Sequence, residues 1–418
     1  MTAPAAAGQM RRRSPPHRVE RERSCTMSTI VSRRPVMRGL PTLLLAACLP
    51  GPLLAAAAQP DGAVVNFHVM HHIDGYEADR VDSPLVAAQD GNLYGVSRYG
   101  GLFGDGTLFR MAPDGTFKKL HTFEVESEAS RPQGLVQASD GHFYGTARYG
   151  GWTGRGRVYR FDPPDSLKTI HDFRGPDGSQ PANAVIVGTD GALYGTTFSG
   201  GAFGSWGTAF RMSTSGETDV LHSFSKDRID GFKPCSRLAQ GSDGDFYGTT
   251  WKGGRHGRGM AFRLTAQGEF AMLHEFDGSD GEEILSGLTE GPDGLFYGVA
   301  YAGGANGVGT LFRLSREGEF AVLLSFERHT HGAHPSGDLL LGRDGYLYGV
   351  TQAGGRSNGT LYRIAADGAF SVLHNFNGSS DGKAPLAGLV ERDDGEFFGV
   401  TSEGGKLSRG TIFRLRVK

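Results

Sequence analysis

Histidine is the potentially reactive residue with the most regular placement in this sequence. It recurs in a Leu-His-x-Phe motif and related forms, and an imidazole can bind a metal ion or hydrogen-bond to a neighbouring group. The six positions are His71, His121, His171, His222, His274 and His374. Leu324 takes the equivalent place in one further copy. Six equivalent imidazoles raise the question of a metal ring, and the answer depends on where the fold places them.

Aromatic and basic residues gather near a second recurring feature, a Gly-Gly pair first seen at Gly100-Gly101. Loop aromatics can stack on sugar rings or on a protein partner, and nearby arginines favour an acidic polysaccharide. The predicted ligand-binding residues are Trp152, Phe203, Trp206, Trp251, Tyr301, Arg155 and Arg258. Two other interpretations stay open: the rings could cap the hydrophobic ends of their own repeats, and the charges could simply be solvated.

Two other segments contain metal-ligand residue types, and the spacing of the first permits metal binding, but the signal for a metal site is weak in both. His329, His331 and His334 form His-x-His-x-x-His, for which a polar loop is the preferred interpretation because no acidic partner is in view. Asp277 and Asp280 lie in a loop that lacks the alternating oxygen ligands and the closing Glu of a calcium loop. We therefore predict no metal ion and no cofactor.

The sequence contains no familiar catalytic motif. Gly-x-Ser-x-Gly, His-Glu-x-x-His and a phosphate-binding Gly-Lys-Ser/Thr are all missing, and no two carboxylates can be placed together from the sequence. No catalytic residue is therefore predicted, and a non-enzymatic role is favoured. An enzyme remains an alternative, because active sites can be assembled from distant parts of a chain.

The elements that must position these residues come from a sevenfold repeat. An Asp-Gly pair opens each copy, with spacings of 50, 50, 53, 50, 51 and 50 residues. The pairs begin at Asp90, Asp140, Asp190, Asp243, Asp293, Asp344 and Asp394. Such a period indicates one supersecondary unit per copy, which cannot bury its apolar face alone.

Each repeat offers four short strands separated by turns. In the first copy these are Pro84–Ala88, Leu93–Ser97, Thr107–Met111 and Phe117–Phe123. Four such strands per repeat are typical of a propeller blade, whereas helical periodicity for a TIM-like or Rossmann fold is missing. We predict an all-β, seven-bladed propeller in which the strand at Val64–Ile73 completes the last blade and closes the ring.

Loop lengths distinguish the two faces of this propeller. The turns after strands one and three are short hairpins such as Asp90-Gly91, and they share one face, called here the plain face. The longer Gly-Gly loops lie on the opposite face, the Gly-Gly-loop face, where function is expected. The repeated histidines fall on outermost strands, far apart around the rim, so each should hydrogen-bond within its own blade rather than share a metal.

Several of these motifs together resemble a known repeat family. Asp-Gly-x-(Leu/Phe)-Tyr-Gly, Gly-Gly, Gly-Thr-x-Phe-Arg-Leu and Leu-His-x-Phe are similar to the Gloeo/Verruco (GloVer) tandem repeat over roughly Ala63 to Lys418. The resemblance implies a propeller-like body and export from a bacterial cell. It implies no activity and no catalytic residue. Because the last expected strand ends next to Lys418, we expect no counterpart of the C-terminal anchor described for such proteins.

The N-terminal segment reads as an export signal. We expect translation to start at Met27, a leader and secretory signal over residues 1–58, a linker over 59–62 and the propeller over 63–418. Cleavage after Ala58 is preferred over a lipobox-like cleavage before Cys48, and only lipidated Cys48 would bring the protein to a membrane.

Charge and cysteine content limit the partners. Residues 59–418 carry 34 basic and 43 acidic side chains, or 34 − 43 = −9, which gives no general attraction to nucleic acid. Cys235 is the single cysteine of the repeats, so it cannot form an internal disulfide, and a small buried side chain is predicted.

From these features we expect a monomeric, non-catalytic, periplasmic or extracellular protein that binds a polysaccharide or an envelope protein through the Gly-Gly-loop face. Two alternatives remain: a polysaccharide lyase or hydrolase with its site in the central funnel, and a purely structural surface protein.

Overall fold

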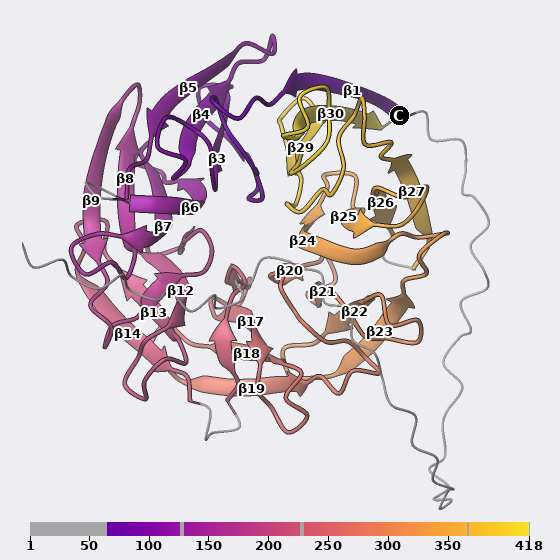
Figure 1. The fold of residues 1–418 in the computed structure, drawn as a ribbon. Coiled ribbons are helices and arrows are strands. Elements are labelled where there is room, and N and C mark those ends of the chain that lie inside the picture. The colour runs from indigo at the N-terminus through magenta and orange to yellow at the C-terminus, as the bar shows by residue number, and fades with distance from the viewer. Residues whose placement is uncertain (1–64, 126–128, 226–229, 366–367, 418) are drawn as a thin grey trace, which may run out of the picture. The chain divides into compact units, whose positions relative to one another are not determined.

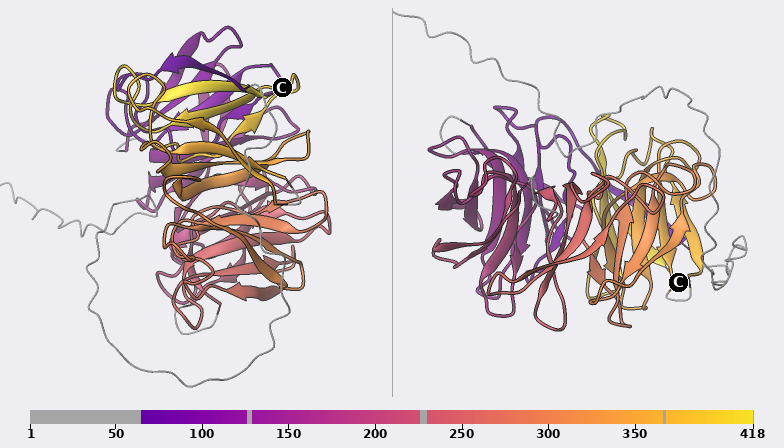
Figure 2. Two further views of the ribbon diagram at one scale, coloured as in Figure 1. Left: turned by 90° about the vertical axis from the view of Figure 1, so that its right-hand side faces the viewer. Right: turned by 90° about the horizontal axis from the view of Figure 1, so that it is seen from below.

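Seven small antiparallel sheets form a ring in the computed structural model, which describes residues 65–125, 129–225, 230–365 and 368–417 (Figure 1). Each sheet is one blade, with its first strand innermost and its last strand outermost. Figure 2 shows the strands running between two faces of the ring. The predicted seven-bladed β-propeller is therefore confirmed. The predicted signal segment and Cys48 lie outside the described residues.

The first four blades follow one another along the chain. Blade 1 consists of β2 (Val86–Ala87), β3 (Leu93–Ser97), β4 (Thr107–Met111) and β5 (Phe117–Thr122). Blade 2 consists of β6 (Ala129–Gln137), β7 (Phe143–Gly150), β8 (Arg157–Asp162) and β9 (Ser166–Asp172). Blade 3 consists of β10 (Ser179–Pro181), β11 (Ile186–Val187), β12 (Leu193–Ser199), β13 (Thr208–Met212) and β14 (Thr218–Ser223). Blade 4 consists of β15 (Phe232–Pro234), β16 (Ala239–Gln240), β17 (Phe246–Lys252), β18 (Met260–Leu264) and β19 (Phe270–Glu275).

The last three blades complete the ring, and the N-terminal strand belongs to the seventh. Blade 5 consists of β20 (Thr289–Glu290), β21 (Phe296–Ala300), β22 (Thr310–Leu314) and β23 (Phe320–Ser325). Blade 6 consists of β24 (Ala333–Leu341), β25 (Leu347–Ala353), β26 (Thr360–Ile364) and β27 (Phe370–Asn375). Blade 7 consists of β28 (Val390–Glu391), β29 (Phe397–Thr401), β30 (Thr411–Val417) and β1 (Val65–His72).

Ring closure takes place between the two ends of the described chain. β1 pairs antiparallel with β30, and Phe67 lies opposite Leu415 in that ladder. The Phe67 ring also stacks on His374 of blade 6, with centroids 3.8 Å apart, and on Phe413 of its own blade. The predicted closing strand is confirmed, and it covers the edge that β30 would otherwise expose.

Glycine in the Tyr-Gly motif lets the second and third strands pack closely. A Cβ built at Gly95 would lie 2.5 Å from the ring of Phe109 on β4, far inside van der Waals contact. Phe109 is fully buried, so the ring has no room to move away. The glycine is therefore required by the aromatic residue that follows it in the repeat.

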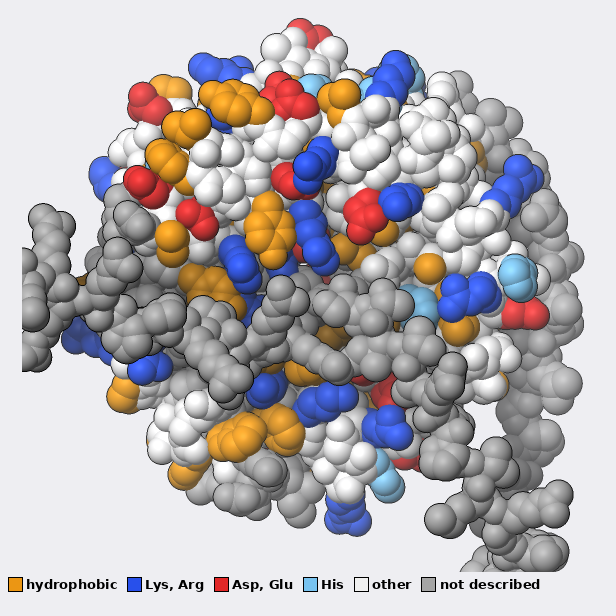
Figure 3. All heavy atoms as spheres, viewed as in Figure 1, with side chains coloured by type: hydrophobic (Ala, Val, Ile, Leu, Met, Phe, Trp, Pro, Cys, Tyr) orange, Lys and Arg blue, Asp and Glu red, His pale blue; other side chains and the backbone are white. Residues whose placement is uncertain are grey.

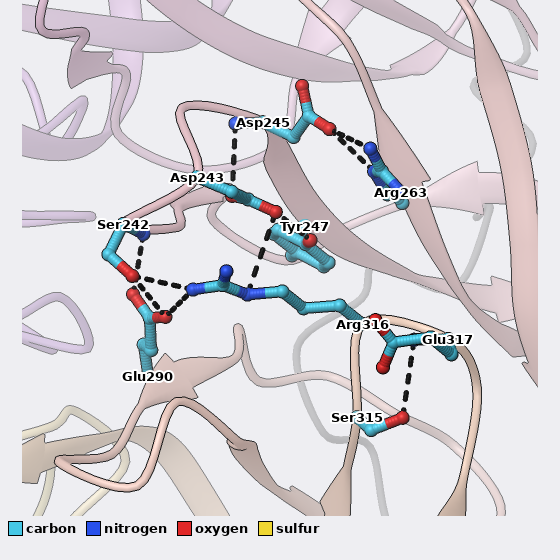
Figure 4. Close-up of polar contacts among 9 residues, drawn as sticks. All are labelled: Ser242, Asp243, Asp245, Tyr247, Arg263, Glu290, Ser315, Arg316 and Glu317. Atoms are coloured by element: carbon cyan, nitrogen blue, oxygen red, sulfur yellow. Dashed lines mark hydrogen bonds and ion pairs between the residues drawn. The ribbon is translucent and has the colours of Figure 1, made fainter.

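The Asp-Gly turn on the plain face is held by side-chain hydrogen bonds that repeat around the ring. In blade 4, Tyr247 Oη donates to Asp243 Oδ2 at 2.6 Å, and the backbone N–H of Asp245 donates to Asp243 Oδ1 (Figure 4). Burial, together with Asp90, raises the pKa of the equivalent Tyr94 in blade 1 to about 12. This hydroxyl therefore stays protonated as a donor.

Arg316 links neighbouring blades on the same face. From the turn after β22 of blade 5, its guanidinium reaches Glu290 of its own blade and Ser242 of blade 4 (Figure 4). The side chain of Glu290 also accepts from the backbone N–H of Ser242 at 2.7 Å. Because these polar side chains bond to one another between the blades, they do not form an evident ligand-binding site on this part of the plain face.

The repeated histidines also join blades. His274 on β19 forms a 2.7 Å hydrogen bond to Asp280 in the loop that follows, and its ring stacks on Phe320 of the next blade at 3.6 Å between centroids. The same bond to a carboxylate recurs at His71, His171, His222 and His374. The prediction of a structural hydrogen bond is confirmed for these five residues.

The innermost strands differ from the prediction: they are shorter or divided in five blades, whereas β6 and β24 are longer, with nine residues each. The expected strand Pro84–Ala88 is reduced to β2, and in blade 3 it is divided into β10 and β11. A residue with positive φ precedes or interrupts each inner strand, as Arg80 does in blade 1 with φ 57°. That conformation breaks the alternation of an extended strand. No helix long and apolar enough to cross a membrane occurs within the described segments.

Removing residues 1–72, and with them β1, should lower the free energy of unfolding by at least about 3 kcal/mol, because Phe67 and its neighbours lose their burial. The uncovered edge of β30 should also promote association. Thermal melts and light scattering measure both effects. A matched deletion of residues 1–62 keeps β1 and should behave as the intact propeller. Equal stability of the two truncated chains would show that ring closure contributes little.

Acidification should destabilise the propeller through buried histidines. Burial lowers the pKa of His374 below the ordinary 6.5, and hydrogen bonding to Asp381 only partly opposes this. Below about pH 6.5 the unfolded chain therefore binds a proton that the folded chain resists, so stability falls with pH. Melting temperatures measured between about pH 7.5 and about pH 5.5 should show this slope. His374→Gln should flatten it, whereas the exposed His256→Gln should leave it unchanged.

Candidate functional site

The Gly-Gly-loop face carries the longer connections of every blade. The blades follow one another counterclockwise in Figure 1. Because β-sheets twist in one direction only, this order means that the viewer of Figure 1 looks at the Gly-Gly-loop face. Figure 3 shows the same side, with Lys and Arg side chains around the centre of the ring. Two rings of residues at constant positions in the repeat form the entrance to the channel there, called here the mouth.

The first ring consists of seven residues with left-handed backbone conformation, called here the positive-φ ring. It comprises Arg80, Arg131, Gln180, Lys233, Glu283, His334 and Ala384, with φ between 52° and 58°. A side chain in this conformation costs about 1 kcal/mol, a cost that glycine avoids. The chain contains 66 glycines, yet none of the seven positions is glycine. Six of the seven carry long or ring-bearing polar side chains instead.

Hydrogen bonds from the preceding blade hold this backbone in place. The N–H of Arg131 donates to Asp105 O at 2.8 Å, and the N–H of Lys233 donates to Trp206 O at 2.7 Å. His334 is bonded in the same way to Val308 O. Such over-determined strained backbone is found where side chains serve a function. The backbone of each of these residues is thus held both by its own blade and by the preceding blade.

The second ring, called here the strand-two ring, lies at the end of the second strand, eight residues after each repeated Asp. It comprises Arg98, Arg148, Phe198, Trp251, Tyr301, Gln352 and Ser402. Neighbouring members contact one another: the Arg148 guanidinium lies 4.9 Å from the Phe198 ring centroid, and Phe198 lies 6.1 Å from Trp251. Tyr301 Oη donates to Gln352 Oε1 at 2.8 Å.

Positive charge concentrates on the side of the mouth formed by blades 1 to 4. Asp82 forms ion pairs with Arg80 and Arg98, at 3.6 and 3.1 Å. Burial lowers the pKa of Arg98, and the nearby charge of Arg148 acts in the same direction. Arg80, Arg98 and Arg148 therefore repel one another, and Asp82 compensates this repulsion only in part.

Three further cations on this side have no carboxylate beside them. Arg131, Arg148 and Lys233 form no ion pair with any residue that the structure describes. Arg148 is 3% exposed and donates to the neutral Gln180 Oε1 at 3.2 Å. Buried charge without a counter-charge is costly. This side of the mouth therefore has the electrostatics of an anion-binding site.

Aromatic rings occupy the adjoining arc of the mouth, on blades 3 to 5. Phe198 is buried, whereas Trp251 and Tyr301 are half-buried. The Tyr301 ring stacks on His334 at 4.6 Å between centroids, and burial raises the pKa of Tyr301 to about 12. Burial also lowers the pKa of His334. The arc thus combines aromatic surface with hydrogen-bonding groups, and the charges beside it, Lys252 and Glu283, pair with each other at 3.8 Å.

The residues predicted from sequence divide between the mouth and the loop tips. Trp251 and Tyr301 belong to the strand-two ring, but Trp152 lies at a loop tip and is 95% exposed. Phe203 and Arg155 are exposed loop residues as well. The seven residues are therefore not brought together as one cluster.

The other two predicted residues are engaged in contacts with neighbouring blades. Trp206 is half-buried and packs edge-on against Phe232 of the next blade, at 5.2 Å between centroids. Arg258 forms an ion pair with Glu282 of the next blade. Trp206 thus makes the kind of capping contact that was an alternative to ligand binding, although toward a neighbour.

Sequence reasoning missed the positive-φ ring. The available signal was a polar residue about ten positions before six of the seven Asp-Gly pairs, often followed by proline, as in Arg131-Pro132, Lys233-Pro234 and His334-Pro335. Its chemical variation between repeats marked it as a place where the copies differ. The predicted face is the one on which this ring lies.

The central channel beneath the mouth contains a cavity of about 360 Å³ lined by inner-strand residues that include Leu85, Asn183 and Arg237. Nearby, Asp338 accepts a 2.6 Å hydrogen bond from the N–H of Gly287, and desolvation raises the pKa of this carboxyl. Within the described ranges, no three His, Cys, Asp or Glu side chains are grouped as a metal site would require. His331 and His334 each have separate partners.

Comparison with protein families finds one match. The model of the Gloeobacter/Verrucomicrobia repeat matches residues 80–291 and 269–418, which confirms the resemblance seen in the repeated motifs. No curated protein sequence matches the chain.

Solved structures share the propeller fold at low sequence identity. One is the extracellular domain of a proposed hybrid two-component system from B. thetaiotaomicron, with a TM-score of 0.56 and 12% identity over 84% of this chain. The present chain spans 41% of that protein's chain. Another is a proposed 6-phosphogluconolactonase from Bacteroides uniformis, with a TM-score of 0.50 and 17% identity over 74% of this chain and 88% of that one. At these identities the likeness concerns the fold alone.

Replacing Arg148 by methionine should leave stability unchanged or raise it by about 1 kcal/mol, because a buried cation without a counter-charge is exchanged for apolar volume. Arg160→Met is the matched control in the same blade. It removes a 2.9 Å ion pair with Asp162 and should lower stability. Denaturant unfolding measures both variants. A loss at Arg148 as large as the loss at Arg160 would contradict the electrostatic interpretation of the mouth.

Proposed function

We propose, from the premise that this chain belongs to the Gloeobacter/Verrucomicrobia repeat family, that it is an exported, non-catalytic propeller that binds a glycan at the mouth. The observation that carries the proposal is the positive-φ ring. Seven residues accept a strained backbone that glycine would relieve, and six of them present polar side chains to one entrance. Such a pattern is expected where side chains are retained for binding rather than for folding.

The neighbouring strand-two ring supplies the second part of a sugar site. Trp251 and Tyr301 offer flat apolar surface, and Tyr301 and Gln352 offer hydroxyl and amide groups. Sugars combine apolar ring faces with hydroxyl groups, so they fit this mixture better than a purely apolar ligand does. A protein partner would instead be expected on a larger and flatter patch.

Export is supported by the sequence of residues 1–58, with its arginines followed by an apolar run that ends at Ala55–Ala58. A periplasmic or extracellular location would bring the mouth into contact with envelope or environmental polysaccharides. The net negative charge of residues 59–418 argues against a nucleic acid as the ligand.

A hydrolase or lyase is the second candidate, and one observation favours it. Asp338 near the channel has a raised pKa, as a general acid would need. A glycosidase ordinarily needs two carboxyl groups across the scissile bond, and in the described ranges Asp338 is the one buried carboxyl whose pKa is raised by desolvation in this way. The two candidates differ in whether the bound glycan is cleaved.

A glycan array probed with the exported chain tests the proposal. Trp251→Ala should weaken retention on the recognised glycan about tenfold, because a stacking surface is lost. Trp152→Ala is the matched control, since its side chain lies at a loop tip outside both rings. Retention lost in Trp152→Ala and kept in Trp251→Ala would move the site to the loop tips and overturn the mouth. Release of new chain ends from the glycan would favour the enzyme.

A further inference from the structure

We infer that the mouth contains a seat for an oxyanion carried by a sugar, formed between blades 2 and 4 by Arg131, Arg148 and Lys233, with Arg155 in the adjoining exposed loop, so that the glycan it selects is acidic. This inference rests on the proposed function, because the seat is part of the same mouth. It adds the charge of the ligand and the residues that recognise that charge.

Ion pairs at one repeated position neutralise this face at two of the seven blade interfaces. Fifteen residues after the repeated Asp, Arg409 of blade 7 pairs with Asp79 of blade 1 at 2.6 Å. At the equivalent position, Arg258 of blade 4 pairs with Glu282 of blade 5. An arginine in the Gly-Gly loop thus reaches a carboxylate at the start of the next blade's inner strand.

The same position is left without a counter-charge between blades 2 and 3. Arg155 stands where Arg258 and Arg409 stand, but the residue equivalent to Glu282 and Asp79 is Ser179. Arg155 is exposed and forms no ion pair with the rest of the described chain. Three interfaces thus carry an arginine at this position. Two of them also carry the carboxylate, and the interface between blades 2 and 3 does not.

A neutral side chain also stands beside the buried Arg148, deeper in the mouth. Arg148 donates to the amide oxygen of Gln180 at 3.2 Å, whereas the neighbouring Arg98 has Asp82 as its ion-pair partner at 3.1 Å. Gln133 donates to the backbone carbonyl of Arg131 at 2.7 Å. An amide oxygen orients a guanidinium group without cancelling its charge. Arg148 is thus held in position and keeps its positive potential.

Arg131 is placed to contact the ligand directly. It is half-buried, and its guanidinium lies 5.4 Å from the ring centroid of Tyr99 and 5.0 Å from that of Tyr149. Its backbone is fixed by the hydrogen bond from its N–H to Asp105 O. A guanidinium held between two rings offers its planar fork to a carboxylate, sulfate or phosphate group. The buried Arg148 adds positive potential from below.

The aromatic arc begins beside the seat. Lys233 Nζ lies 4.7 Å from the ring centroid of Phe198, and Trp251 follows on the next blade. A sugar whose oxyanion lies at Arg131 could therefore place its ring over this arc. Because the rest of residues 59–418 is acidic overall, one charged sugar or the end of a chain suits the seat better than a long, uniformly charged polymer.

Calorimetric titration of the full chain tests the inference with four probes: an oligogalacturonate, its neutral methyl ester, a sulfated neutral oligosaccharide and inorganic sulfate. An oligosaccharide that carries an oxyanion should bind about tenfold to a hundredfold more tightly than the neutral ester, and its affinity should fall with added salt. The carboxylate and sulfate arms identify which oxyanion is preferred. If inorganic sulfate binds tightly and the acidic oligosaccharides do not, the seat is a simple ion site, and the inference that a sugar carries the oxyanion is wrong.

Arg131→Gln is the decisive variant. Gln180 holds the same backbone conformation in blade 3, so the substitution is compatible with the fold. It should reduce the affinity for the acidic probe to that for the ester and leave the ester unaffected. Lys233→Gln, at another position of the same ring, should act in the same direction. Arg356→Gln, in an exposed loop of blade 6, is the matched control and should change neither affinity.

The outcomes separate the seat from the proposed function. Equal binding of acidic and neutral probes, with a loss in Trp251→Ala, would sink the oxyanion seat and keep the glycan site. Preference for the acidic probe that survives in Arg131→Gln and Lys233→Gln would place the charge recognition elsewhere and also sink the seat. If no oligosaccharide binds, both the seat and the glycan function fail.

Discussion

Packing between successive blades is the interaction on which the whole structure depends. A single blade buries little of its own surface, and its large side chains reach the next blade, as Tyr94 of blade 1 does when its ring lies 4.4 Å from that of Phe143. The seventh interface exists only because β1 joins β30, and Phe67 of that strand stacks on His374 of blade 6. The packing of blade 7 against its neighbours is therefore conditional on the ring being closed.

Because the blades must pack against one another, most of the repeated polar side chains serve to connect blades and loops. On the plain face, Arg316 and Glu290 connect blades 4 and 5. At the rim, each described histidine–carboxylate pair holds a loop against the strand before it, and some of the rings cover the next blade. Chemically suggestive residues at constant positions are thus explained by the ring itself. Residues that vary at a constant position, as in the positive-φ ring, are not.

The fold could be predicted from the sequence, because particular residue types identify its turns and its closely packed strands. Asp90-Gly91 predicts a hairpin, and Gly95 with Phe109 predicts two strands in tight contact. The strand bounds of β3 and β4 follow directly. The inner strands were less predictable, because the residue type of Arg80 and of its counterparts does not itself dictate a positive φ.

The site was only partly predictable, for a related reason. Trp251 and Tyr301 attract attention as loop aromatics, and both lie in the mouth. Trp152 and Arg155 look equivalent to them in sequence, but they lie in exposed loops. The distance of a side chain from the channel is set by strand two and its neighbours, not by residue type. Gln180 and Gln133 gave no signal at all, since their role is defined by the arginines beside them.

The asymmetry of the mouth is the feature that blade packing explains least. A sevenfold repeat tends to place the same pair at the same position, and Arg409–Asp79 and Arg258–Glu282 show that an ion pair fits there. Its loss at Arg155 and Ser179 is not required by packing, because both arrangements occur on one scaffold. Removing the carboxylate while keeping the cation offers no stability in return. The uncompensated charge of blades 2 to 4 is therefore the feature on which the proposed acidic ligand rests.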